Sequence, residues 1–155
     1  MPAIGEAGKK GSTVRSDCHV AVEIQSDGGL KIQLKSKVEG MFGDRIKETM
    51  RQGCEMMGVQ HATISVEDMG ALPLTLAARL ETAVRRAGYE PTAEFLLPMK
   101  DHCCYLSTKD CLRRSRLYLP GNEPKFYVNA GLHEPDGIIL DLEDSVAPSE
   151  KDAAR

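Results

Sequence analysis

The sequence predicts an α+β fold, a small two-layer ββαβα sandwich followed by the start of a parallel α/β unit. Apolar residues alternate with polar ones over residues 19–35 and 62–67, which is typical of strands with one buried face. Between residues 38 and 57 apolar residues recur at steps of three and four, which indicates a helix. After residue 112 a short strand, a short helix and a continuous apolar run follow one another in the order of a βαβ unit.

Residues 1–18 are expected to form a mobile N-terminal arm. Small or rigid residues interrupt this segment before any periodic pattern begins, and basic and hydroxyl side chains lie between them. The interrupting residues are Pro2, Gly5, Gly8 and Gly11, the basic ones are Lys9, Lys10 and Arg15, and the hydroxyls are Ser12, Thr13 and Ser16. A mobile hydroxyl beside positive charge is what a carrier protein needs in order to bear a phosphate-linked arm.

Residues 19–88 are expected to form the sandwich itself. Its two first strands flank a Ser-Asp-Gly-Gly sequence at residues 26–29, which predicts a β-hairpin with one solvated face. The remaining elements are, in order, a helix over 38–57 ended by Gly58, a third strand over 62–67, and a second helix that opens at Pro73 and stops at Gly88.

Residues 89–112 lose this periodicity and are interpreted as a connector. The segment 113–155 then gives a strand around residues 117–119, a short helix within 124–131, and the apolar run 137–142, which is typical of a strand buried on both faces. Roughly 43 residues are far fewer than the about 250 of a (β/α)8 barrel, so we expect 113–155 to be the truncated start of one. A parallel strand pair without its barrel leaves apolar surface exposed.

Composition excludes several classes of function. With 20 Lys and Arg against 23 Asp and Glu the net charge is −3, so the sequence as a whole predicts neither a nucleic-acid partner nor an anionic membrane partner. No apolar run approaches the roughly 20 residues that cross a bilayer, and the N-terminus is too polar for a signal peptide. Five scattered cysteines form no disulfide framework and no standard zinc spacing, so we expect free thiols, a cytoplasmic protein and no metal site.

Candidate catalytic residues follow the apolar run at 137–142. Glu143 and Asp144 lie just past its carboxyl end, which is where parallel α/β folds place catalytic groups, although solvated turn residues remain the alternative. Asp141, inside the run, is interpreted as a hydrogen-bonded structural residue. Arg114, in the cluster Arg113, Arg114 and Arg116, is the candidate substrate-binding residue, because a guanidinium binds carboxylates and phosphates with two hydrogen bonds.

Two stretches of sequence resemble components of one enzyme system. Ser16-Asp17, the segment VEGMFGDRI at 38–46 and the segment EDMGAL at 67–72, followed by Arg79, resemble the acyl carrier protein, or gamma subunit, of citrate lyase. Residues 113–155, with Arg-Ser, a Pro-Gly turn and Leu-Glu-Asp-Ser-Val, resemble the start of the citrate lyase beta subunit and of the HpcH/HpaI aldolase family of CoA-ester lyases.

The resemblance implies an acyl carrier that holds acetyl and citryl thioesters during cleavage of citrate to acetate and oxaloacetate. Its cofactor would be a phosphoribosyl-dephospho-CoA arm, joined to a serine by a phosphodiester. In the family that serine stands two residues before the Asp matched by Asp17, a position that Arg15 occupies here, so Ser16 is the nearest hydroxyl and Ser12 the alternative. The implied partners are the citrate lyase alpha and beta subunits, the prosthetic-group transferase and the acetate ligase.

Other functions remain open at this point. Mg²⁺ is expected only in a complete lyase domain, and we do not expect residues 113–155 to cleave citrate alone. Because Arg15 stands where a serine is expected, the alternative is a non-modified docking or regulatory domain attached to a CoA-ester lyase. A weaker alternative is the carrier of a related decarboxylase.

Overall fold

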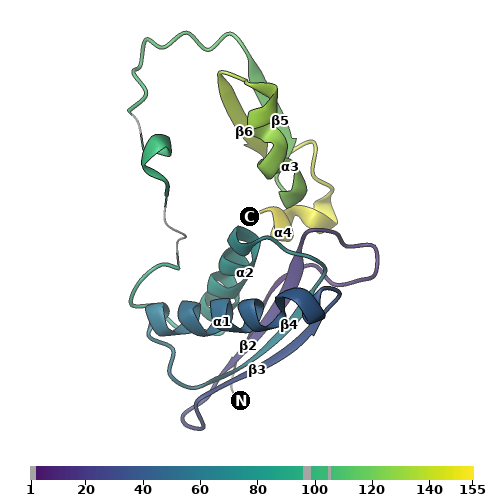
Figure 1. Cartoon of the computed structure of the whole chain (residues 1–155), viewed down its shortest axis with the longest axis vertical. Helices are drawn as coiled ribbons and strands as arrows, with labels where there is room; N and C mark the ends of the chain where they lie inside the picture. Colours follow the sequence, from purple (N-terminus) through teal and green to yellow (C-terminus); the bar gives the residue numbers. More distant parts are fainter. Residues whose placement is uncertain (1–2, 96–98, 105) are drawn as a thin grey trace. The chain divides into compact units, whose positions relative to one another are not determined.

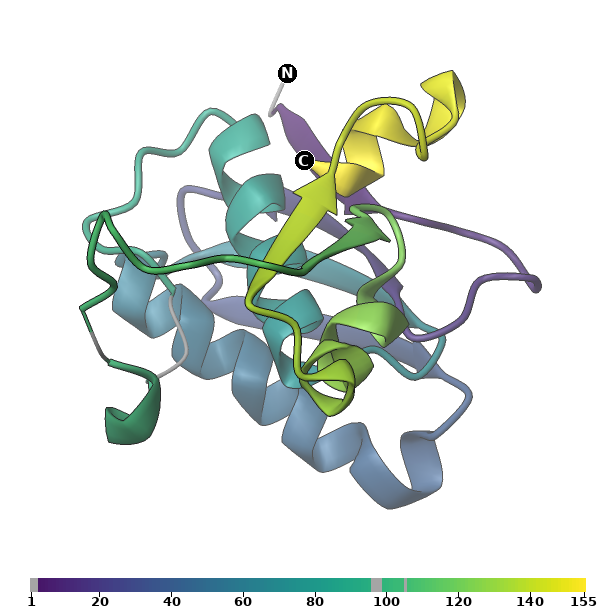
Figure 2. The ribbon, with the colours of Figure 1, turned by 90° about the horizontal axis from the view of Figure 1, so that it is seen from above.

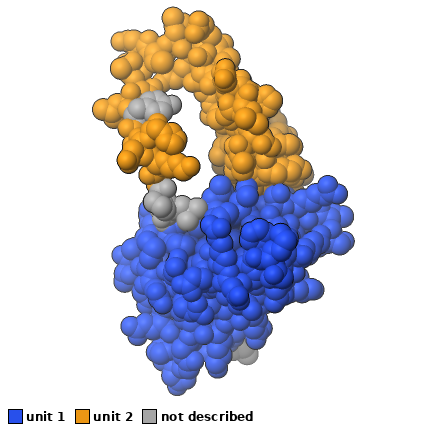
Figure 3. All heavy atoms as spheres, in the orientation of Figure 1, with its two compact units in different colours: residues 1–96 blue, residues 97–155 orange. Residues whose placement is uncertain are grey.

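The computed structural model describes residues 3–95, 99–104 and 106–155 of the 155-residue chain. The chain divides into two compact units, residues 1–96 and 97–155, coloured separately in Figure 3. Within the described residues, no helix has the length and apolar character that a membrane span requires.

The first unit is a four-stranded mixed sheet with two helices, α1 and α2, against it (Figure 1). Its elements are β1 (Ile4–Gly8), β2 (Cys18–Ile24), β3 (Leu30–Ser36), α1 (Glu39–Met57), β4 (Ala62–Asp68) and α2 (Pro73–Arg86). The order in the sheet is β1-β2-β4-β3, with β3 and β4 parallel and the other pairs antiparallel. This confirms the α+β class, while the element order is βββαβα because one strand had not been predicted.

The unpredicted strand is β1, which lies in the segment that the sequence analysis assigned to a mobile arm. All five of its residues pair with β2, and Ala7 is buried. Gly5 lies so close to α2 that a Cβ atom there would come within 1.9 Å of the Ala83 carbonyl oxygen. Glycine, which usually indicates a break in a strand, is here the residue that allows the strand to approach the helix backbone.

The predicted hairpin of β2 and β3 is wrong, because β4 lies between these two strands. Gly28 and Gly29, both at positive φ, turn the chain after β2. The turn leaves β2 and β3 apart in the sheet, and β4 pairs with both of them. The Gly29 amide donates to Nδ1 of His61 at 3.0 Å, and the Ala62 amide donates to the Gly29 carbonyl at 3.1 Å. β4 has the more apolar buried face, with Ala62, Ile64 and Val66 at most 1% exposed, and therefore takes a central position.

The two predicted helices are confirmed. Helix α1 buries Ile46, Met50, Cys54 and Met57 along one stripe and ends at Gly58, whose φ of 81° gives a left-handed C-cap. Helix α2 begins with Pro73 in its first turn, a position where the missing amide hydrogen costs nothing.

The start of the predicted connector packs against the first unit. The Tyr89 hydroxyl donates to the Gly58 carbonyl at 2.7 Å, and Phe95 is 7% exposed within the core cluster. Among the described residues of the connector, the one regular element is a short 3-10 helix, Asp101–Cys103. Leu96, Leu97, Pro98 and Tyr105, which also fall in the predicted connector, lie outside the described residues.

The second unit is a short β-α-β segment (Figure 2). Its elements are β5 (Arg116–Pro120), α3 (Pro124–Asn129), a 3-10 turn (Ala130–His133), β6 (Gly137–Asp141), a second 3-10 turn (Pro148–Glu150) and α4 (Lys151–Ala154). β5 and β6 are parallel, which confirms the predicted βαβ order. Ile138 and Leu140 of β6 are 48% and 49% exposed, so this strand is not buried on both faces here and apolar surface is open, as expected of an unclosed sheet.

Candidate functional site

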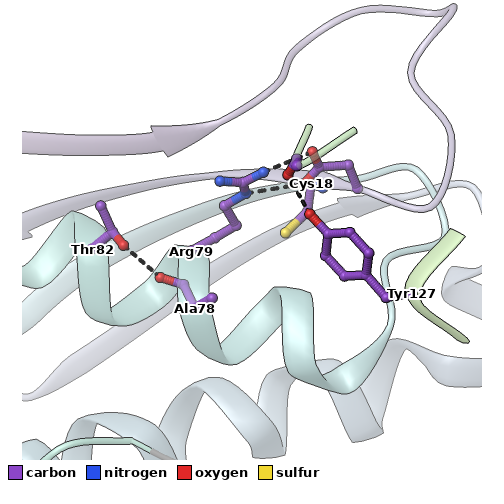
Figure 4. Close-up of polar contacts among 7 residues, drawn as sticks. Cys18, Ala78, Arg79, Thr82 and Tyr127 are labelled. Carbon is purple, nitrogen blue, oxygen red and sulfur yellow. Dashed lines mark hydrogen bonds and ion pairs between the residues drawn. The ribbon is translucent and has the colours of Figure 1, made fainter. Parts of the chain in front are cut away.

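A buried ion pair fixes the start of β2 to α2. The Arg79 guanidinium donates from Nε to Oδ1 of Asp17 at 3.1 Å and from Nη2 to Oδ2 at 2.9 Å, a two-pronged contact. Asp17 is 1% exposed and Arg79 9%. Figure 4 shows Arg79 reaching from the helix toward the strand that carries Cys18, whose amide also donates to Asp17 at 2.7 Å. Residue 17, placed in the arm by sequence reasoning, is therefore an anchored residue.

A second buried carboxylate, Asp68, lies at the end of β4, in register with Cys18 on β2. We call the region around Asp17, Arg79 and Asp68 the corner. Its Oδ1 accepts from the amides of Gly70 at 3.1 Å and Ala71 at 2.7 Å, and its Oδ2 accepts from the Ser36 hydroxyl at 2.6 Å. The Ser36 oxygen in turn accepts from the amide of Val38 at 3.0 Å. Asp68 thus ties the end of β3 and the start of α1 to the loop before α2.

The two candidate attachment residues both lie at this corner. The Ser16 amide donates to the Met69 carbonyl at 3.2 Å, while the Met69 amide donates to the Asp17 carbonyl at 3.0 Å. Ser16 is half-buried, with a φ of 55° that is uncommon for a residue other than glycine. Ser12 is exposed, and its carbonyl accepts from Nζ of Lys37 at 3.4 Å. Within the described parts of the chain, neither serine hydroxyl makes a hydrogen bond, and the Ser12 side chain is the more exposed of the two.

An apolar cavity of about 310 Å³ lies between α1 and the start of α2, beside the same corner. Its apolar walls include Val38, Phe42 and Ile46 on one side and Ala71, Leu72 and Leu76 on the other. Arg45 and Thr49 also line it. Sequence reasoning assigned the stripe on α1 to the core and so missed that its first turns leave a cavity.

The cysteines do not form a reactive centre in the first unit. Burial, with a smaller contribution from Asp17, raises the pKa of the Cys18 thiol far above its ordinary value, and burial raises the pKa of Cys54 to about 12. Both thiols are therefore protonated and unreactive near neutral pH. Cys18, Cys54, Cys104 and Cys111 are free, as expected, and the described residues contain no cluster of potential metal ligands.

The candidate residues of the second unit lie at two opposite ends of its sheet. Arg114 precedes β5, where its backbone amide and that of Ser115 donate to Asp136 at 2.9 Å. Hydrogen bonds from Ser115, chiefly from its amide, hold the pKa of Asp136 below its ordinary value. Glu143 and Asp144 follow β6 at its carboxyl end and are exposed, so the structure does not bring them together with Arg114.

Asp141 is hydrogen-bonded within its own loop, as expected from the sequence. It accepts from the amide of Glu143 at 2.8 Å and from that of Ser145 at 3.0 Å. Hydrogen bonding by Ser145, followed by the Glu143 amide, lowers the pKa of Asp141. Lys151, which sequence reasoning did not single out, donates to the carbonyls of Leu142 and Glu143 and thereby fixes the loop that carries the two acidic candidates.

Comparison with known families assigns a family to each of the two units. Residues 6–87 match the acyl carrier family described as "Malonate decarboxylase delta subunit (MdcD)", and residues 114–155 match the family "HpcH/HpaI aldolase/citrate lyase".

Curated relatives define the first family more closely. A citrate lyase acyl carrier protein of Vibrio cholerae serotype O1 (strain M66-2) is 38% identical over 77 residues, covering 50% of this chain and 79% of the relative. That of Halothermothrix orenii is 40% identical over 77 residues, 50% of this chain and 81% of the relative, and that of Fusobacterium nucleatum subsp. nucleatum is 39% identical over 80 residues, 52% and 85%. The chain belongs to the citrate lyase acyl carrier protein family through its N-terminal half.

Proposed function

We propose that this chain is the acyl carrier of a citrate-lyase-type assembly and holds acetyl and citryl thioesters on a covalently attached CoA-like arm. The observation that carries the proposal is the position of Ser16, a half-buried hydroxyl beside Asp17, in a domain that belongs to the citrate lyase acyl carrier family. The family implies a prosthetic group, and Ser16, with Ser12 as the alternative, is the attachment residue we propose.

The residues of the corner fit a phosphodiester-linked group. Lys10, Arg15 and Lys37 lie on or beside the segment that carries the two serines and would offset the negative phosphodiester. Ser16 is held by one main-chain hydrogen bond, from its amide to the Met69 carbonyl, which does not involve its hydroxyl. The arm, when bound, supplies a thiol that forms the acyl thioester.

The chain's own residues then have two tasks. The Asp17–Arg79 pair fixes the base of the arm to the rigid helix α2, and the basic residues neutralise its phosphate. Cleavage and acyl exchange are assigned to the proposed partners, the citrate lyase alpha and beta subunits. Loading is assigned to a prosthetic-group transferase, and acetylation of the thiol to an acetate ligase.

The test is intact mass and peptide mapping of the full chain expressed with its modification enzymes. We expect the mass of a phosphoribosyl-dephospho-CoA adduct on the peptide that contains Ser16, lost in Ser16→Ala and retained in the neighbouring Thr13→Ala. An adduct retained in Ser16→Ala and lost in Ser12→Ala moves the site to Ser12. An unmodified chain refutes the carrier and favours the non-modified docking or regulatory domain.

For the second unit we propose the beginning of a CoA-ester lyase domain, in which Glu143 and Asp144 act at the carboxyl end of β6. Arg114 lies at the other end of the sheet, so its proposed substrate contact would be with a separate part of the substrate. The match of residues 114–155 to the HpcH/HpaI family supports this, and Mg²⁺ belongs to the complete lyase domain. In a complete lyase domain that begins with this segment, Glu143→Gln should lower the rate of oxaloacetate release, while the exposed control Glu134→Gln should leave it unchanged. Equal rates for both variants would remove Glu143 from the proposal.

A further inference from the structure

The cavity between α1 and α2 lies within short reach of Ser16, the first proposed attachment residue. The Ser16 amide bonds to the carbonyl of Met69, and the next residues along the chain, Gly70 and Ala71, line the cavity. Consecutive Cα atoms are about 3.8 Å apart, so the Cα atom of Ala71 lies within about 8 Å of that of Met69. The Ser12 carbonyl accepts a hydrogen bond from the side-chain Nζ of Lys37, the residue before the cavity residue Val38.

The apolar walls fit a short, largely apolar segment, and a charged group attached to it would remain at the solvent-exposed rim. A volume of about 310 Å³ lies at the lower end of the range for ligand pockets, so it fits part of an arm and not a whole nucleotide. Arg45 has no acidic partner within 4 Å in the part of the chain that the structure describes, although other basic side chains of α1, such as Lys47 and Arg51, do. Arg45 is exposed, so its guanidinium lies at the rim of the cavity and can pair with a carboxylate that stays in contact with water.

We propose that this cavity receives the apolar thioester end of the chain's own arm and that Arg45, exposed at its rim, pairs with one of the two free carboxylates of the citryl group. The inference rests on the proposed function, since the occupant is the arm attached at Ser16 or Ser12. Docking there removes the thioester from water between visits to the partner subunits, and undocking exposes it for transfer. The chain therefore shields its acyl group as well as carrying it.

Rigid hydrogen bonds keep the cavity formed whether or not it is filled. Asp68 holds the amide of Ala71 on one wall and, through Ser36, the amide of Val38 on the other. A preformed site binds an attached group at little conformational cost, because only the arm is ordered on docking.

The test uses the full chain loaded with the acetylated or citrylated arm, with Thr49→Leu to fill the cavity. Thr82→Leu is the matched control, because both threonines are half-buried on a helix and each donates its hydroxyl at 2.8 Å to the carbonyl four residues earlier (Thr82 in Figure 4). Thr82 does not line the cavity. The readouts are amide NMR shifts of Gly70 and Ala71 on loading and the rate at which hydroxylamine cleaves the thioester.

Docking predicts shifts at Gly70 and Ala71 in the parent chain and in Thr82→Leu, and their loss in Thr49→Leu. If the arm is docked nine-tenths of the time, hydroxylamine cleavage is about 10-fold slower than in Thr49→Leu, because only the undocked fraction reacts. Arg45→Gln should remove the extra protection of the citryl form over the acetyl form, and Arg51→Gln should not.

The outcomes separate this inference from the carrier function. A chain shown by mass to carry the arm, but without shifts at the cavity and with equal cleavage rates in all variants, overturns the docking inference and leaves the carrier in place. A chain without an arm overturns both.

Discussion

The buried pair of Asp17 and Arg79 gives the sharpest prediction about stability. Arg79→Met keeps the apolar length of the side chain but removes both hydrogen bonds, at 2.9 and 3.1 Å, from a carboxylate that is 1% exposed. The amide of Cys18 then remains as a donor to Asp17. Removing one partner of a buried pair costs about 3 to 5 kcal/mol, since the remaining charge stays buried.

The assay is urea unfolding of the full chain followed by circular dichroism at the helix band. Helices α1 and α2, of 19 and 14 residues, are the two longest described helices and dominate this signal. With a denaturant slope of about 2 kcal/mol/M, the expected loss lowers the midpoint by about 2 M. Such a loss is a large part of the total stability of an ordinary domain.

Two further variants decide whether burial is the cause. Arg51→Met removes the exposed pair of Arg51 and Glu48 on α1 and should leave the midpoint almost unchanged, because solvent screens it. The double variant Asp17→Leu/Arg79→Met should recover most of the loss, because no unpaired charge remains. An effect of Arg79→Met below about 1 kcal/mol, the value of a surface pair, would refute the reasoning.

Three more predictions follow from single contacts. Burial, and secondarily Lys10, lowers the pKa of His19 below its ordinary 6.5, so the unfolded chain takes up the proton first as pH falls. The urea midpoint should therefore fall between pH about 7.5 and about 5.5, and His19→Gln should reduce that fall; an equal fall in both proteins contradicts it. Gly5→Ala should lower the thermal midpoint because its Cβ overlaps the α2 backbone, whereas Gly40→Ala, with open space around it, should not; equal midpoints would argue against the close approach. Asp141→Ala should speed hydrogen exchange at the amides of Glu143 and Ser145, and Ser149→Ala should not; unchanged exchange contradicts the loop hydrogen bonds.

The helices were predictable from the sequence because the pattern that indicates them is local. The stripe from Ile46 to Met57 and the ends at Gly58 and Pro73 depend on neighbours within one or two turns. The strand order was not predictable in this way. Nothing between β2 and β3 indicates that β4, more than 30 residues later, lies between them, and the glycines of β1 indicate flexibility until α2 is placed against Gly5.

Several residues of the candidate site were predictable from the sequence, but the contacts between them were not. Motif reasoning singled out Ser16, Asp17 and Arg79, but the contact between Asp17 and Arg79 spans 62 positions and leaves no local pattern. Arg45 and Thr49 stand beside an apolar stripe that predicts a packed core, and only the bend of the chain at Gly70 and Ala71 leaves space there. The acidic candidates at Glu143 and Asp144 could be placed at a strand end because that position follows from the βαβ order alone.

The two buried carboxylates join the proposed attachment residue and the proposed docking cavity in one structural unit. Asp17 joins the start of β2 to α2, and Asp68, paired in register with Cys18 on the neighbouring strand, joins the end of β4 to both walls of the cavity. The main-chain bonds between Ser16, Asp17 and Met69 lie between these two carboxylates. A change at Asp68 should therefore disturb the cavity and the setting of Ser16 together, although Asp68 contacts neither the Ser16 hydroxyl nor, by this proposal, the arm. If Asp68→Asn instead altered docking and left the Ser16 amide shift unchanged, the two functions would be independent, and the corner would not be a single structural unit.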